Sequence, residues 1–189
     1  MSAMNQIFEL LLGSAISIYL MLLWLRFLMQ LVQADFYNPV AQTVVRLTDP
    51  VLQPLRGALP RSRHYDFASL VAILLLALLG ETLVSLVATG MTLPPALLVF
   101  KTVFGLLWKM TDFFFWLLIV SVVLSWVSPG YNPATVMIRQ LAEPVLAPFR
   151  RILPPMGGLD LSPIVAFLAI QVVQILLATA ARGLAPYLA

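Results

Sequence analysis

The chain contains one segment twice: DPVLQPLRGALP at residues 49–60 and EPVLAPFRRILP at residues 143–154. The match extends outward from both copies without a gap, so Tyr37-Asn38-Pro39 aligns with Tyr131-Asn132-Pro133. Self-similarity at a fixed offset is the signature of structural repeats. We therefore expect two repeats, each organised around one copy of this segment. Their expected bounds are residues 1–94 and 95–189.

The composition is that of an integral membrane protein. Hydrophobic residues make up 61% of the chain and charged residues only 10%, whereas the charged share of a soluble domain is nearer one quarter. Several apolar runs reach about 20 residues, which is enough for a helix to cross the hydrocarbon core. We expect an all-α membrane protein with four transmembrane helices, at about residues 7–33, 67–88, 108–128 and 162–182.

The arginines predict the orientation of these helices. They gather in the two segments that follow the first and third helices: Arg46, Arg56, Arg61 and Arg63, and then Arg139, Arg150 and Arg151. The N-terminal tail and the connection at residues 89–95 hold no Lys or Arg. Since basic loops stay in the cytoplasm, we expect both segments inside and both termini outside. Both repeats then insert in the same direction, as parallel repeats related by an axis along the membrane normal.

The repeated segment has the features of a short helix at the membrane surface. Asp49 followed by Pro50 is typical of an N-cap followed by the first helical position. Pro54 lacks a backbone donor and crowds the preceding turn, so no long helix is expected to pass through it. We expect a short, kinked element, preceded by a separate helix at about residues 39–48 that also lies flat on the membrane.

The side chains of this element predict an amphipathic helix. Val51, Leu55 and Leu59 recur every four residues and share one face. The arginines lie at its polar edge, which favours an interfacial element with guanidinium groups at the level of lipid phosphates. The motif residues are Asp49, Pro50, Pro54, Arg56 and Pro60, and then Glu143, Pro144, Pro148, Arg150, Arg151 and Pro154. They would bind anionic lipid headgroups or a membrane-protein partner, or form only a stiff connector.

Two further aspartates precede the second helix of each repeat. Asp66 and Asp160 occupy aligned positions, and Ser162-Pro163 follows the latter as a second cap and first-turn pair. We expect both aspartates to cap helices rather than to bind a ligand.

Ionisable residues within the membrane helices are functional candidates because they are costly there. We expect an intramembrane polar layer formed by Glu81, Lys109, Asp112, Gln171 and Gln174. Glu81 would pair with Lys109 or be held by one of the glutamines, and Lys109 with Asp112 is the alternative pair. Arg26 lies nearer the cytoplasm and is expected to extend its side chain to the surface. The layer would be a cation or proton relay, or a set of polar contacts that fixes helix packing.

The sequence offers little support for an enzyme. His64 is the only histidine, the chain has no cysteine, and no His, Asp or Glu cluster has metal-ligand spacing. A glycine-rich phosphate loop is also absent. We therefore expect no catalytic residue, no metal and no cofactor, and the few scattered arginines predict no direct nucleic-acid binding.

The doubled motif resembles that of the YggT family of bacterial membrane proteins. The second copy continues as GGLDLSPIV at residues 157–165, and the resemblance covers both repeats. It implies a bacterial inner-membrane protein. Bacterial members are linked to osmotic-shock tolerance, and plastid relatives to membrane-complex assembly and nucleoid organisation. No catalytic residue of the family is implied.

Two functions remain open from the sequence. The first is a non-catalytic scaffold or assembly protein that associates with membrane proteins or with itself. The second is a channel or transporter subunit for a cation or small osmolyte. Glu81 argues against a symmetric pore because its aligned position in the second repeat is Ile175.

Overall fold

The computed structural model describes residues 3–60, 62, 65–127, 132–153 and 160–187. All elements in these ranges are helices. In chain order they are α1 (Ala3–Leu31), α2 (Pro39–Ala58), α3 (Phe67–Thr89), α4 (Pro95–Val127), α5 (Pro133–Ile152), α6 (Ser162–Leu184) and a short 3-10 helix, η1 (Ala185–Tyr187).

Four of the helices, α1, α3, α4 and α6, are long and apolar enough to cross a membrane. This confirms the all-α class and the four predicted spans. The third span was the least accurate prediction, because α4 begins at Pro95 rather than near residue 108 and has 33 residues. The first half of α4 contains Lys101 and Lys109, which interrupt the apolar run in the sequence, but it is helical as well. At about 1.5 Å per residue, α4 extends beyond an ordinary hydrocarbon core.

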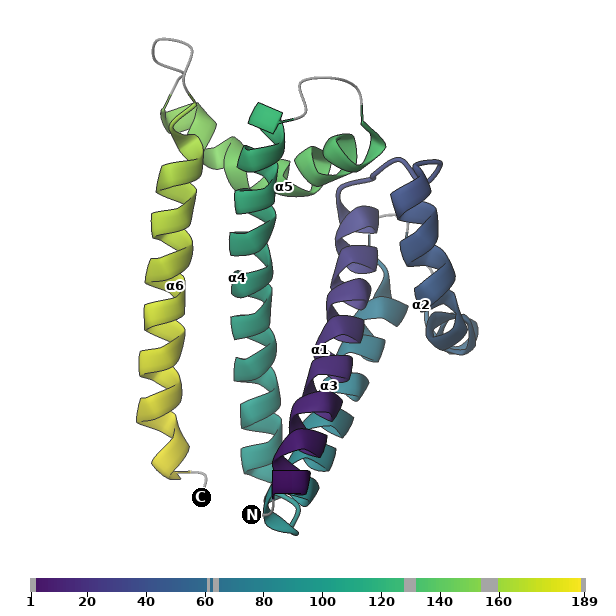
Figure 1. The fold of residues 1–189 in the computed structure, drawn as a ribbon, viewed down its shortest axis with the longest axis vertical. Helices are drawn as coiled ribbons and strands as arrows, with labels where there is room; N and C mark the ends of the chain where they lie inside the picture. The colour runs from purple at the N-terminus through teal and green to yellow at the C-terminus, as the bar shows by residue number, and fades with distance from the viewer. Residues whose placement is uncertain (1–2, 61, 63–64, 128–131, 154–159, 188–189) are drawn as a thin grey trace.

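The four long helices stand side by side, and both chain termini lie at one end of them (Figure 1). At the opposite end, α5 runs across the ends of α4 and α6, whereas α2 slopes back along α1 (Figure 1). The hydroxyl of Tyr19 on α1 donates a hydrogen bond to the carbonyl of Leu47 on α2 at 3.0 Å, which ties α2 to the side of α1. The expectation that both surface helices lie flat therefore does not describe α2.

Helices α1 and α3 pack closely against each other. At Gly80 of α3, an added Cβ would lie 3.0 Å from the Cγ2 atom of Ile16 on α1, so the glycine allows the two backbones to approach. Small residues are the usual means of close helix packing in membranes.

Two clusters of buried side chains hold the fold together. One lies inside the first repeat and joins α1, α2 and α3 around Leu23, Leu52 and Ala72. The other contains Met29 and Val44 of the first repeat together with residues of α4, α5 and α6. The second cluster therefore connects the repeats beneath the surface helices.

Each surface helix is continuous over 20 residues, which corrects the expected short element. The helices begin after Asn38 and Asn132, whose side chains accept hydrogen bonds from backbone N–H groups of the first turn. A proline follows each asparagine at the first helical position, which its fixed φ suits. Asp49 and Glu143 are therefore not N-caps but lie within the helices.

The internal prolines are tolerated because they face outward. Pro50, Pro54, Pro144 and Pro148 lie inside α2 and α5, and all four are exposed. Each removes one backbone donor, but the hydrogen bonds that are lost lie on the solvent or lipid side of the helix.

The predicted apolar face of α2 is only partly right, since Leu55 and Leu59 do pack against the cluster around Leu52. The buried face runs through Ala41, Val44, Thr48 and Leu52, whereas Val51 is exposed. The prediction began a separate element at Asp49, so its apolar face did not include the buried residues of the preceding turns.

Candidate functional site

The charged residues of the first motif form an ion-pair clasp around Arg56. Its Nη1 atom lies 3.2 Å from Asp49 on the same helix, and its Nη2 atom lies 3.0 Å from Asp66. Asp66 is 5% exposed and also caps α3, accepting hydrogen bonds from the backbone N–H and the hydroxyl of Ser69. The predicted capping role of Asp66 is therefore confirmed, and the same carboxylate joins α2 to α3.

The second motif forms the corresponding clasp around Arg150. This guanidinium pairs with Glu143 on α5 and, through Nε, with Asp160 at 3.0 Å. Asp160 accepts hydrogen bonds from the backbone N–H and hydroxyl of Ser162, the first residue of α6. The N-cap position itself is Leu161, which makes no side-chain cap, so the expected cap at Ser162 is wrong and Asp160 contacts the first turn from one residue further back. We call these two sites the first clasp (Asp49, Arg56, Asp66) and the second clasp (Glu143, Arg150, Asp160).

Hydrogen bonding controls the protonation of the second clasp. Burial alone would raise the pKa of Asp160, but hydrogen bonds from Ser162 and Arg150 lower this pKa below its usual range. Burial of Arg150 lowers its pKa, but its contacts with Asp160 and Glu143 outweigh this effect and raise the pKa. Both groups are therefore charged at neutral pH.

A pH titration should show where the second clasp breaks. A carboxylate with a lowered pKa stabilises the fold above its ordinary pKa, and this stabilisation is lost as pH falls through the lowered value. The melting-temperature difference between the parent protein and Asp160→Asn should be constant from about pH 5 to 8, begin to fall below about pH 4 and vanish only once the pH lies below the lowered pKa of Asp160. A change in this difference near neutral pH would contradict the assignment.

The first clasp has an additional arginine that the second lacks. Arg26 on α1 is 7% exposed, and its Nη2 atom lies 3.8 Å from Asp49. Its guanidinium also lies 5.1 Å from the centre of the Phe36 ring. Arg26 does not extend to the surface as expected, because α2 covers it. The aligned residue of the second repeat is Val120.

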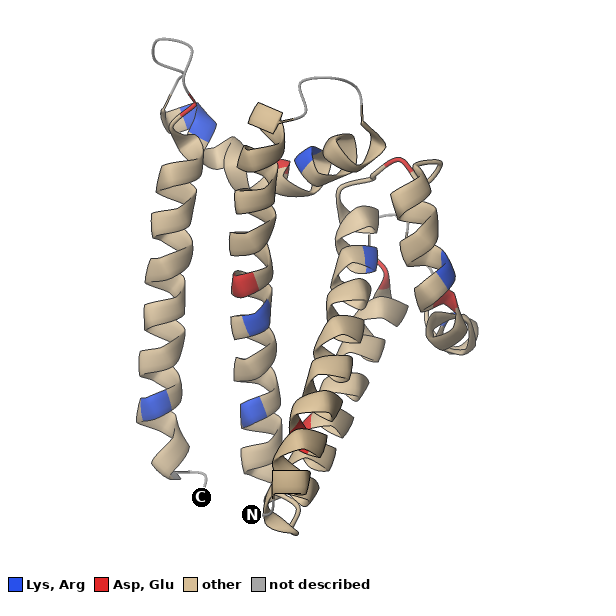
Figure 2. Cartoon of the chain, in the orientation of Figure 1, with Lys and Arg blue, Asp and Glu red and all other residues tan. Residues whose placement is uncertain are grey.

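The clasps change the interpretation of the surface arginines. Arg56 and Arg150 bind carboxylates within the chain, so the expected contact with lipid phosphates does not describe their main partners. Arg46, Arg139 and Arg151 are exposed, and no ion pair involves them in the described ranges. Most charged residues lie toward the end of the molecule that carries α2 and α5, and fewer lie within the membrane-spanning helices (Figure 2).

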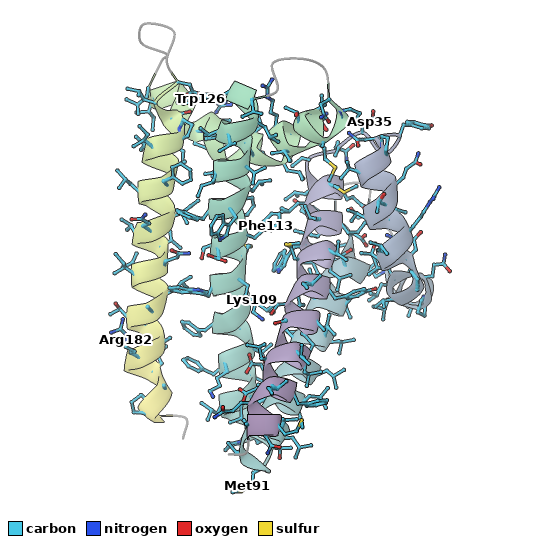
Figure 3. The ribbon with its side chains drawn as sticks, viewed as in Figure 1. Asp35, Met91, Lys109, Phe113, Trp126 and Arg182 are labelled. Carbon is cyan, nitrogen blue, oxygen red and sulfur yellow. The ribbon has the colours of Figure 1, made fainter. Side chains whose placement is uncertain are left out.

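The predicted intramembrane layer is only partly brought together. Glu81 and Lys109 line one cavity between α1, α3 and α4, but no ion pair within 4 Å involves Glu81 among the described residues. The Nζ atom of Lys109 instead lies 3.3 Å from the hydroxyl of Ser17 on α1. Lys109 lies midway along α4 (Figure 3).

The other members of that layer lie elsewhere. Asp112 is exposed and lines a larger, mostly apolar groove of about 700 Å³ between α1 and α4. It forms no ion pair with Lys109 in the described part of the chain. Gln171 and Gln174 are on α6, which packs against α4 and α5, and neither lines the cavity of Glu81.

Three features were missed at the level of sequence. The charge spacing of both clasps is identical, with seven residues to the arginine and ten more to the aspartate, and this signal was available. The amide of Asn38 donates a hydrogen bond to the carbonyl of Pro133 at 2.6 Å, which joins the repeats. The buried, unpartnered hydroxyl of Thr102 is the third, and no sequence pattern indicates it.

Some expectations fall outside the described residues. These are Pro154, Tyr131, His64 and the residues 157–158. In the described part of the chain, no group of three His, Cys, Asp or Glu side chains is placed to hold a metal ion.

The fold and the clasps define a multi-pass helical membrane protein with two similar halves, each fastening a surface helix to the span that follows. The family model described as CCB3/YggT matches residues 4–87 and 100–181, and the chain belongs to this family. The resemblance stated from the motif is thereby confirmed.

Bacterial relatives cover most of the chain, and a chloroplast relative covers a shorter part of it. An uncharacterized protein of Pseudomonas aeruginosa is 44% identical over 162 residues, covering 85% of this chain and 82% of the relative. The uncharacterized protein YggT of Escherichia coli K12 is 39% identical over 167 residues, covering 87% and 85%. The chloroplastic YlmG homolog protein 2 of Arabidopsis thaliana is 49% identical over 56 residues, covering 29% and 22%. No solved structure matches the chain.

Proposed function

We propose that the chain is a non-catalytic scaffold of the bacterial inner membrane that presents α2 and α5 to membrane-protein partners on the cytoplasmic side. The observation that carries this proposal is the duplication of the clasp. In both repeats an arginine in the last turn of the surface helix binds a carboxylate on that helix and an aspartate at the start of the next span. Such a clasp fixes the direction in which each helix leaves the membrane.

Exposed apolar side chains on the fixed helices support a partner surface. Leu47 and Val51 on α2 are 49% and 41% exposed, and Ile152 at the end of α5 is 75% exposed. A second copy of the chain is one partner that these side chains could contact. The concentration of arginines at this end, opposite to both termini, supports its cytoplasmic orientation.

The scaffold proposal predicts that the clasps matter more to the cell than Glu81. The double variant Arg56→Ala, Arg150→Ala should reduce survival of osmotic downshock, and the cross-linking of probes on α2 to membrane proteins, more than Glu81→Gln does. A matched control is Arg46→Ala, Arg139→Ala, which removes the same charge from exposed positions. Greater loss of survival in Glu81→Gln would contradict the proposal.

A second candidate is a channel or transporter subunit, favoured by the cavity that Glu81 and Lys109 line. It requires solute flux that depends on Glu81 and persists when the clasp arginines are replaced. Light scattering of proteoliposomes after salt and neutral-solute gradients measures that flux. Fast volume recovery that Glu81→Gln abolishes would replace the scaffold proposal with transport.

A further inference from the structure

The cavity beside Glu81 is formed by small residues on three different membrane helices. Gly13 on α1, Ala77 and Gly80 on α3, and Gly105 on α4 line it. Nothing lies within 4 Å of a Cβ added at Gly13, and at Gly105 the nearest atom is Glu81 Oε1 at 3.9 Å. The volume is about 240 Å³, many times the roughly 10–15 Å³ that one water molecule requires on this measure.

One buried hydroxyl group in this cavity has no partner. Thr102 on α4 lines the cavity and is 1% exposed, and its Oγ1 atom makes no hydrogen bond. Threonines in membrane helices commonly bond to a carbonyl one turn earlier, as Thr82 does with Leu78. An unsatisfied buried hydroxyl is unfavourable, so the one on Thr102 points to a bound polar molecule.

The charged lining has two separated poles. Glu81 supplies a partly buried carboxylate from α3, and Lys109 supplies an ammonium from α4 that is exposed and also lines the groove of Asp112. Among the described residues the two charges are not paired within 4 Å. Ser17 on α1 accepts from Lys109 at 3.3 Å, which directs the ammonium toward α1. An unpaired charge at this depth is costly, so a ligand that carries both opposite charges would satisfy both poles.

We propose that this cavity binds a small zwitterion of the amino acid or betaine class. Its cationic group lies against Glu81, its carboxylate accepts from Lys109, and the hydroxyl of Thr102 donates to the same carboxylate. A simple cation would neutralise Glu81 but meet the charge of Lys109, and a simple anion would meet Glu81. The site shares no residue with the clasps and requires no transport. Failure of this proposal would therefore leave the scaffold proposal unaffected, and the reverse also holds.

Equilibrium dialysis of the full chain in lipid nanodiscs tests the proposal with four radiolabelled probes. Glycine and glycine betaine carry both charges, whereas choline carries only the cation and acetate only the anion. Saturable binding of at least one zwitterion, at about one per chain, is expected, with choline and acetate bound at least about tenfold more weakly.

Matched variants locate the site. Glu81→Gln and Lys109→Met should each weaken zwitterion binding at least about tenfold, and Thr102→Val, which keeps the side-chain shape, by a few-fold. Asp112→Asn, a carboxylate outside the cavity, and Thr111→Val, whose hydroxyl bonds within α4, should bind like the parent protein. Gly13→Leu should block the cavity without changing its charge.

Three results would overturn the proposal, provided that circular dichroism shows native helix content in each sample. They are the absence of saturable binding of both zwitterions to the parent protein, equal affinity for choline or acetate, and equal loss of binding in Asp112→Asn and Glu81→Gln.

Discussion

Replacing Arg56 with alanine is expected to lower the free energy of unfolding by about 3 kcal/mol, and replacing Arg150 by no more than about 1 kcal/mol. The two residues occupy the same position in the two clasps, but their surroundings differ. Loss of Arg56 leaves the buried carboxylate of Asp66 without its counter-ion, and breaking such a pair is strongly destabilising. Arg150 and Asp160 are 41% and 40% exposed, so the solvent screens both charges.

Reversible unfolding in mixed micelles with increasing SDS measures this difference. Arg46→Ala on α2 is the control, since it removes an exposed arginine from the same helix. Asp66→Asn should restore much of the stability of Arg56→Ala, because a neutral amide no longer requires the arginine. Equal losses for Arg56→Ala and Arg150→Ala would show that the buried carboxylate does not determine the strength of the clasp.

The spans and the repeats could be predicted because their signals are local and long. An apolar run such as residues 67–88 allows almost no interpretation other than a membrane helix, and α3 matches it within one residue. The duplicated motif located four of the clasp residues, Asp49, Arg56, Glu143 and Arg150, for a similar reason. The family assignment rests on the same residues.

The sequence-based predictions were wrong at positions where local rules compete or where helices that are distant in the sequence pack together. Pro54 is a helix breaker by the usual rule, but its exposed position in α2 removes most of the penalty, and exposure is a property of the packed fold. Arg26 was expected to reach solvent because the sequence does not show that α2 folds back over it. The environment of Thr102 depends on the packing of three helices and has no signature in any one of them.

The hydrogen bond between Asn38 and Pro133 leads to a second contrast between the repeats. Both Asn38 and Asn132 cap their helices with the side-chain oxygen. Within the described ranges, Asn38 alone of the two also uses its amide group, donating to the Pro133 carbonyl at 2.6 Å, and Asn38 is buried whereas Asn132 is exposed. A comparison of variants at Asn38 and Asn132 can therefore distinguish the effect of helix capping from the effect of the contact that joins the two halves of the protein.

Substitution by aspartate makes that separation measurable. Aspartate is as good an N-cap as asparagine and is favoured by the helix dipole, so Asn132→Asp should change the free energy of unfolding by less than about 0.5 kcal/mol. Asn38→Asp replaces the amide donor with a carboxylate oxygen that faces the Pro133 carbonyl in a buried position, and a loss of about 2 kcal/mol is expected. The alanine variants should follow in the same order, at about 2 kcal/mol for Asn38→Ala and about 1 kcal/mol for Asn132→Ala. The same SDS titration measures all four variants. If Asn38→Asp proved as stable as Asn132→Asp, the contact between the repeats would have to depend on the apolar cluster alone.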